Sequence, residues 1–321
     1  MYPLVSVICL CYNHARFIEE AVNSVVSQTY KDVELIIVDD QSTDNSVEVI
    51  SQLMKKNDQL RFIKNDKNIG MCKSFNKALK ETKGEFIIDL AADDIMLCER
   101  IMEQVEAFLT LKATYGVVYS DAYLINEKGE KITTFYKRNE LGGLMETAPS
   151  KKVFKDLIHS YRICSPTIMV RKKVLEELGG YDENLSYEDY DFFVRSSREY
   201  RYFYIDKPLM LKREVVGSDS SSWYKTGTNN THLSSTLLVC KKALWLCKTK
   251  EEKTALLHSV RYHFRQAYFL NVFLLVEDYY ELIGSIHKQS ITDKIILRLS
   301  RKNINVYPIY LYYLKVRKVI R

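Results

Sequence analysis

The sequence predicts an α/β protein: a doubly wound, mostly parallel sheet with helices on both faces, followed by a C-terminal helical region. Residues 4–11, 33–38 and 86–90 are largely continuous apolar runs, as expected of strands buried on both faces. Segments with helical spacing of apolar residues separate these runs. A regular alternation of strand and helix at these lengths builds a parallel sheet with right-handed crossovers.

The first third of the chain supplies most of the predicted sheet. We expect strands at residues 4–11, 33–38, 60–64 and 86–90, and helices at about 17–28, 42–55 and 70–79. Ligands bind such sheets outside the carboxyl ends of the strands. The loops that we expect at this edge carry Tyr12, Asp39, Gly70, Asp93 and Asp94.

The second half has a different pattern. Residues 117–126 and 131–136 predict an antiparallel hairpin. We then expect strands at 165–170, 202–205 and 209–213, and helices at 172–178 and 192–198. The serine-rich stretch 217–222 predicts a flexible lid, and from about residue 228 onward only helical periodicity remains.

Composition indicates a globular protein of the cytoplasm. The chain of 321 residues is 46% hydrophobic and 27% charged, and no run approaches the ~20 apolar residues that a membrane-spanning helix needs. The seven cysteines are scattered, so we expect reduced core residues rather than disulfides or a zinc site. The first strand begins at Leu4 without a basic leader, so no signal peptide is expected.

Charge is distributed unevenly along the chain. Residues 240–321 hold 16 basic and 6 acidic side chains, whereas residues 1–239 hold 31 and 35. Together with the aromatic and basic tail from residue 307, this excess predicts peripheral contact with an anionic membrane surface. The alternatives are a solvated helical face and packing of the tail on the rest of the protein. Nucleic acid is not an expected partner.

Asp93 and Asp94 close the central apolar strand. Aspartate is costly to bury, and hard divalent cations bind carboxylates together with substrate phosphates. The pair therefore predicts a Mg²⁺ or Mn²⁺ site. The alternative is that the two acids cap a helix starting near Met96.

Several stretches together resemble the family 2 glycosyltransferases, which have the GT-A fold of nucleotide-diphospho-sugar transferases. The stretches occur in order over residues 3–224: VSVICLCYN (5–13), SQTY (27–30), LIIVDDQSTD (35–44), NIG (68–70), LAADD (90–94), GGYDE (179–183) and ED (188–189). The resemblance implies a GT-A domain at 1–224, with a nucleotide-binding half at 1–110 and an acceptor half at 111–224. Residues 225–321 form a separate helical region.

The resemblance also implies roles for individual residues. Asp189 matches the catalytic base, and Asp94, with Asp93, matches the metal site. On the acceptor or sugar side we expect Asp121, Glu188 and Arg213. For the donor nucleotide we expect Leu10, Tyr12, Asp39, Gly70, Lys73 and Asp93.

Three positions depart from the family pattern. Ala91 stands where many relatives have a first aspartate, Phe75 where an arginine often occurs, and Val215 where a histidine is common. Ala91 and Val215 leave the predicted metal site with fewer protein ligands, and magnesium can keep water molecules in their place. Phe75 instead leaves a phosphate contact of the family pattern without its arginine.

The sequence thus predicts an inverting glycosyltransferase that moves a sugar from a nucleotide diphosphate, most simply a UDP-sugar, to a glycan or lipid-linked oligosaccharide of a cell-surface polysaccharide. One rival is a nucleotidyltransferase that makes sugar nucleotides, although residues 12–15 are not a glycine-rich phosphate loop. The other is a non-enzymatic membrane or nucleic-acid binder that acts through the basic C-terminal region.

Overall fold

The computed structural model describes residues 2–215, 226 and 230–312. The chain divides into two compact units. The first contains the described residues up to Val153 and those of Arg162–Val215, and the second contains Phe154–Tyr161 and the described residues after Val215. The predicted lid at 217–222 lies outside the described residues.

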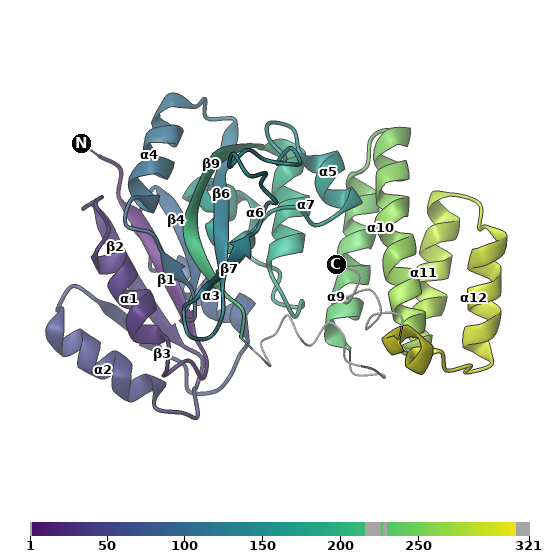
Figure 1. Cartoon of the computed structure of the whole chain (residues 1–321), viewed down its shortest axis with the longest axis horizontal. Helices are drawn as coiled ribbons and strands as arrows, with labels where there is room; N and C mark the ends of the chain where they lie inside the picture. Colours follow the sequence, from purple (N-terminus) through teal and green to yellow (C-terminus); the bar gives the residue numbers. More distant parts are fainter. Residues whose placement is uncertain (1, 216–225, 227–229, 313–321) are drawn as a thin grey trace. The chain divides into compact units, whose positions relative to one another are not determined.

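A mixed sheet forms the centre of the first unit, with helices on both faces (Figure 1). Among the described residues its order is β3-β2-β1-β4-β8-β6-β9-β5, and β7 pairs with β6. The first four strands in this order run parallel. The predicted α/β fold is thereby confirmed. The strands are β1 Val5–Cys11, β2 Val33–Asp39, β3 Arg61–Lys64, β4 Phe86–Ala91, β5 Ile95–Met96, β6 Tyr115–Ile125, β7 Lys131–Thr134, β8 Met169–Arg171 and β9 Arg201–Arg213.

Successive residues of a strand point to opposite faces of the sheet, so the apolar central strands need helices on both faces to cover them. Val5, Val7 and Cys9 of β1 share one buried cluster with apolar residues of α1, α2 and α4. The intervening residues of β1 and β4 point to the other face. The helices of this unit are α1 Ile18–Val26, α2 Ser46–Lys56, α3 Met71–Leu79, α4 Arg100–Thr110, α6 Lys172–Leu178 and α7 Asp189–Glu199.

The segment after β4 differs from the expected one. Ile95 and Met96 form β5, which pairs antiparallel with β9, and α4 begins only at Arg100. The expectation of a helix starting near Met96 is therefore wrong, and the two acids at 93–94 do not cap it. Hydrogen bonding to a strand more than 100 residues later overrides the local pattern.

Two further predictions of local structure need correction. Ser165–Thr167 is a turn of 3-10 helix, so the strand expected at 165–170 is reduced to β8. The two late strands expected at 202–205 and 209–213 are one strand, β9. β9 pairs in parallel along β6, and a shift of register next to Pro208 accommodates the proline without ending the strand.

The second unit is helical, as predicted. Its described helices are α5 Phe154–His159, α9 Thr231–Leu246, α10 Lys250–Phe269, α11 Phe273–Ile286 and α12 Ile291–Arg301. Capping boxes begin α10 at Thr249 and α12 at Ser290. α5 comes from the middle of the chain and packs on α10, where the rings of His159 and His258 stack 4.2 Å apart. Among the described residues, no helix combines the length and hydrophobicity that crossing a bilayer requires.

Candidate active site

The register of the parallel strands brings several predicted site residues to one edge of the sheet. Cys11 lies opposite Asp39, and Leu10 lies opposite both Val38 and Ala91. Tyr12 follows directly and is 46% exposed, so its ring is open to a ligand. Leu10, Tyr12, Asp39 and the acids after β4 therefore share the carboxyl edge.

Asp39 is buried at the end of β2. Its Oδ2 accepts a hydrogen bond from the Ser42 N–H at 3.0 Å. Its Oδ1 is buried and has no hydrogen-bond partner among the described residues. A buried carboxylate oxygen without a donor is costly, and a ligand N–H at this position would remove that cost.

The loop that carries Tyr12 is braced against the loop after β2. The N–H of Asn13 donates to Ser42 Oγ at 2.9 Å, and Asn13 Oδ1 accepts from the Thr43 N–H at 2.7 Å. The N–H of His14 donates to Ser46 Oγ at 3.0 Å. Asn13 has a φ of 58°, a left-handed conformation that asparagine tolerates better than most residues. These bonds fix the two loops relative to each other.

Asp40 is a residue of this edge that the sequence analysis missed. Its carboxylate accepts hydrogen bonds from the N–H groups of Ile69 and Gly70 at 2.9 and 2.8 Å, and from the Asn65 side chain at 2.9 Å. Gly70 has a φ of 87°, and nothing lies within 4 Å of the position a Cβ would take. Asp40 thus holds the turn that leads into α3, where Lys73 is exposed.

Asp94 is almost fully buried, and Asp93 beside it is partly exposed. Asp94 Oδ1 accepts a hydrogen bond from the Arg213 N–H at 2.8 Å. Burial, and secondarily the charge of Asp93, raise the pKa of Asp94 to about 8. Near neutral pH this carboxyl therefore favours its protonated form unless a positive charge compensates it.

The side chain of Arg213 holds the main chain of the same segment by hydrogen bonds. Its guanidinium donates to the carbonyls of Asp93 at 2.9 Å and Glu127 at 3.0 Å, and to the Glu20 carboxylate at 2.5 Å. The side chain is only 2% exposed. These bonds use the guanidinium to hold the main chain of the acidic pair, a role that sequence reasoning did not assign to it.

Asp189 is the first residue of α7, and Glu188 is its N-cap. Oδ1 of Asp189 accepts a hydrogen bond from the Tyr190 N–H at 2.6 Å. Asp189 lies close enough to β4 for its charge to contribute, after burial, to raising the pKa of Asp89 to about 7. The N-terminus of α7 therefore lies near the strand whose end carries Asp93 and Asp94.

Asp121 is engaged within the protein. It is fully buried, and its Oδ2 accepts two hydrogen bonds from the Arg138 guanidinium, at 2.9 and 2.7 Å. Its Oδ1 accepts from the N–H groups of Ala122 and Tyr136. Both oxygens thus bind protein donors, and a direct contact with a sugar would have to compete with them.

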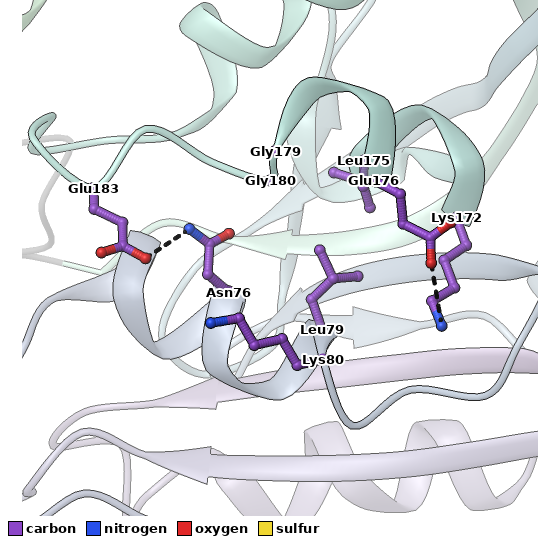
Figure 2. Close-up of a pocket in the computed structure, with 9 residues that line it drawn as sticks. All are labelled: Asn76, Leu79, Lys80, Lys172, Leu175, Glu176, Gly179, Gly180 and Glu183. Carbon is purple, nitrogen blue, oxygen red and sulfur yellow. Dashed lines mark hydrogen bonds and ion pairs between the residues drawn. The ribbon is translucent and has the colours of Figure 1, made fainter.

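A separate depression of about 350 Å³ lies between α3 and α6 (Figure 2). Asn76 and Glu183 are hydrogen-bonded at one side of it, and Lys172 and Glu176 form an ion pair at the other. None of the predicted site residues is among those that line it, and Gly179 and Gly180 form part of its wall.

The residues at the sheet edge fit a cation only in part. Among the described residues, no group of three or more histidine, cysteine, aspartate or glutamate side chains is arranged to hold a metal ion. Asp93 and Asp94 supply two carboxylates, and because burial raises the pKa of Asp94 to about 8, a cation would be needed to stabilise its charged form at neutral pH. Such a pair suits an ion that takes its remaining ligands from a diphosphate and water.

Comparison with known proteins identifies the family of this chain. The sequence model of the family described as Glycosyl transferase family 2 matches residues 6–179. An uncharacterized glycosyltransferase of Methanocaldococcus jannaschii is 31% identical over 222 residues, which are 68% of this chain and 73% of that protein. A second relative, from Rickettsia bellii, is 27% identical over 298 residues, and the match spans 40% of its length and 91% of this chain.

Solved structures share the fold at low sequence identity. Residues 1–349 of TarS from S. aureus, in complex with UDP-GlcNAc, superpose with a TM-score of 0.66 and 21% identity, covering 94% of this chain and 88% of that one. The mannosyltransferase PcManGT from Pyrobaculum calidifontis, in complex with GDP-Man and Mn²⁺, gives 0.58 and 16%, covering 94% and 80%. With the family match over more than half of its length, this chain belongs to glycosyl transferase family 2 and is a glycosyltransferase with the GT-A fold.

Proposed function

We propose that this protein is an inverting glycosyltransferase that moves a sugar from a uridine diphosphate donor to a hydroxyl of a glycan or lipid-linked oligosaccharide. The observation that carries the donor side is the buried Oδ1 of Asp39, which has no partner among the described residues. A uracil ring N–H would donate to this oxygen, and the exposed Tyr12 ring would stack on the base.

The diphosphate would lie at the end of β4. Asp93 and Asp94 would hold Mg²⁺ or Mn²⁺ there, consistent with the raised pKa of Asp94. When bound, the cation supplies positive charge that offsets the charge developing on the leaving diphosphate. Ala91 and Val215 add no ligand, so the donor oxygens and water would complete the coordination. Arg213 would keep the main chain of Asp93 in place.

Asp189 would act as the general base. Its carboxylate would accept the proton of the acceptor hydroxyl as that oxygen attacks the anomeric carbon from the face opposite the leaving group. A single displacement with one base inverts the configuration at that carbon. Glu188, as the N-cap of α7, would support this turn from the acceptor side.

The second unit would contact an anionic membrane that carries the acceptor, on the cytoplasmic side. Ile291 and Ile295 are 79% and 53% exposed and lie one turn apart on α12, with the exposed cations Lys294 and Arg298 beside them. Exposed apolar residues flanked by cations suit the interface between lipid headgroups and acyl chains.

Asp39→Asn tests the nucleotide site. The amide oxygen can keep the Ser42 bond, which leaves the amide NH₂ facing the ring N–H of uracil, donor against donor. We expect UDP affinity, measured by calorimetry, to fall about 10- to 100-fold. Asp66→Asn, at an exposed position of the same edge, is the control. Equal UDP affinity in Asp39→Asn and the wild type would remove the residue from the base site, and GDP titrations test the choice of base.

Asp94→Asn tests the cation site. In the wild type we expect Mn²⁺ to raise the affinity for UDP, because the ion links the carboxylates to the diphosphate. The variant should bind UDP with the same affinity with and without Mn²⁺. An unchanged manganese effect in the variant would contradict the assignment, and Asp66→Asn should retain the effect in full.

Asp189→Asn tests the base. With water replacing the acceptor hydroxyl, slow hydrolysis of the UDP-sugar that the protein binds best can be followed by UDP release. We expect this rate to fall about 10²- to 10⁴-fold, with UDP affinity within twofold of the wild type. Hydrolysis at the wild-type rate would exclude Asp189 as the base.

Vesicle cosedimentation tests the membrane surface. We expect binding to phosphatidylglycerol vesicles, weaker binding at high salt, and none to phosphatidylcholine vesicles. Replacing both Ile291 and Ile295 with serine should weaken binding about tenfold. Leu109→Ser, at a 59% exposed position of α4, is the matched control. Equal binding to both kinds of vesicle, or to neither, contradicts the proposal.

A further inference from the structure

Asp89 is an acid inside the apolar strand β4, and the proposed reaction assigns it no role. Ile88 and Leu90 on either side of it are buried, and Asp89 itself lies opposite Ile8 of β1. Because strand residues alternate, its side chain points to the same face as Ala91, two positions nearer the carboxyl edge. Position 91, where the family pattern has an aspartate, is alanine here, and Asp89 is an acid on the same face of β4, two residues further from the carboxyl edge.

In the described part of the chain, one tyrosine donates a hydrogen bond to this carboxyl. The hydroxyl of Tyr181 donates to Asp89 Oδ2 at 3.1 Å. The Tyr181 ring stacks on Phe75 of α3, with centroids 4.2 Å apart and planes at 23°. Asn76 fixes the main chain of Tyr181 twice, since its amide NH₂ donates to the Tyr181 carbonyl at 2.8 Å and its Oδ1 accepts from the Tyr181 N–H at 2.9 Å.

The same tyrosine contacts the helix that carries the candidate base. The ring of Phe192, one turn after Asp189, meets the Tyr181 ring edge to face at 5.9 Å and 73°. Arg195, further along α7, donates to the carbonyls of Leu178 and Gly180 at 2.9 Å each. Through these contacts α7 is docked on the segment that ends in Tyr181.

The pKa of Asp89 reflects its burial and its two neighbours, Tyr181 and Asp189. Burial first, and Asp189 second, raise the pKa of Asp89 to about 7, while the Tyr181 bond opposes the rise. Burial raises the pKa values of the Cys9 and Cys72 thiols, so both thiols are neutral at pH 7. The titratable groups near Asp89 or its tyrosine partner are Cys72 of α3, Tyr181, Glu188 and Asp189, and Cys9 of β1 lies beside them with its side chain on the opposite face of the sheet.

We propose that Asp89, bonded to Tyr181, is a positioning residue that sets the place of Asp189 relative to the end of β4. The hydrogen bond joins the strand that leads to the diphosphate site with the segment on which α7 rests. Loss of the bond would let α7 shift away from the reacting atoms while leaving the base site at Asp39 intact. This inference rests on the proposed role of Asp189.

The test measures both turnover and UDP affinity. Asp89→Ala and Tyr181→Phe each remove one partner of the bond, and we expect each to lower donor hydrolysis about tenfold or more, with UDP affinity kept within twofold. The double variant should be no slower than the slower single variant, because both remove the same bond. Asp89→Asn keeps an oxygen that can accept from Tyr181 and should recover most of the rate lost in Asp89→Ala.

Tyr200→Phe is the matched control, because the Tyr200 hydroxyl bonds Glu177 at the surface. Additive effects in the double variant, a wild-type rate in either single variant, or a parallel loss of UDP affinity would overturn the proposal. Should Asp89→Ala fail to fold, Tyr181→Phe and Asp89→Asn decide the question. A wild-type rate in Asp189→Asn would instead overturn the proposed base.

The pH dependence of the stability of the folded protein gives a second test that does not measure activity. Burial raises the pKa of Asp89 to about 7 in the folded protein, whereas an aspartate in the unfolded chain has a pKa of ~4. The folded state therefore binds more protons in this interval, and the contribution of Asp89 to stability falls as pH rises towards 7. The melting temperature of Asp89→Asn should fall less than that of the wild type between pH 5 and 8, and equal slopes would contradict this environment.

Discussion

The parallel pairing of β1 with β2 on one side and β4 on the other determines where the acids of this protein lie. Because all three strands end at the same level, Asp39 and the pair at 93–94 come to one edge although more than 50 residues separate them. They are two strands apart, which is about 10 Å. A ligand with a base at one end and phosphates at the other can therefore contact both groups. The proposed donor site follows from this pairing.

Burial of acids is the second constraint. Asp94 and Asp89 lie on β4 or just after it, and both have pKa values raised mainly by loss of water. Among the described residues, the Arg213 main-chain N–H donates to Asp94 and the Tyr181 hydroxyl donates to Asp89, and neither carboxyl forms an ion pair. By contrast, Asp121 is neutralised by Arg138. The two kinds of environment distinguish acids held by an uncharged donor from one paired with a guanidinium.

Much of the fold could be predicted because local patterns determine it. Apolar runs identify β1, β2 and β4, and helical spacing identifies α1 to α3. β5 and the continuity of β9 could not be predicted, because they depend on hydrogen bonds between distant segments. The candidate site also has one part that the sequence could predict and one part that it could not. Motifs indicate the acids at the strand ends, whereas the Tyr181–Asp89 bond joins positions 92 residues apart, and no pattern in either segment reveals the other.

The excursion of α5 into the second unit has a topological consequence. The chain leaves the first unit after Val153, contributes α5 to the helical unit and returns at Arg162. Phe154, Leu157 and Ile158 form the buried side of α5, which packs on α10, a helix synthesised almost 100 residues later. During synthesis, the side of α5 that packs on α10 stays uncovered until α10 has been made, so the helical unit cannot be completed before that point. A fragment ending at Val215 would carry α5 with that side still uncovered.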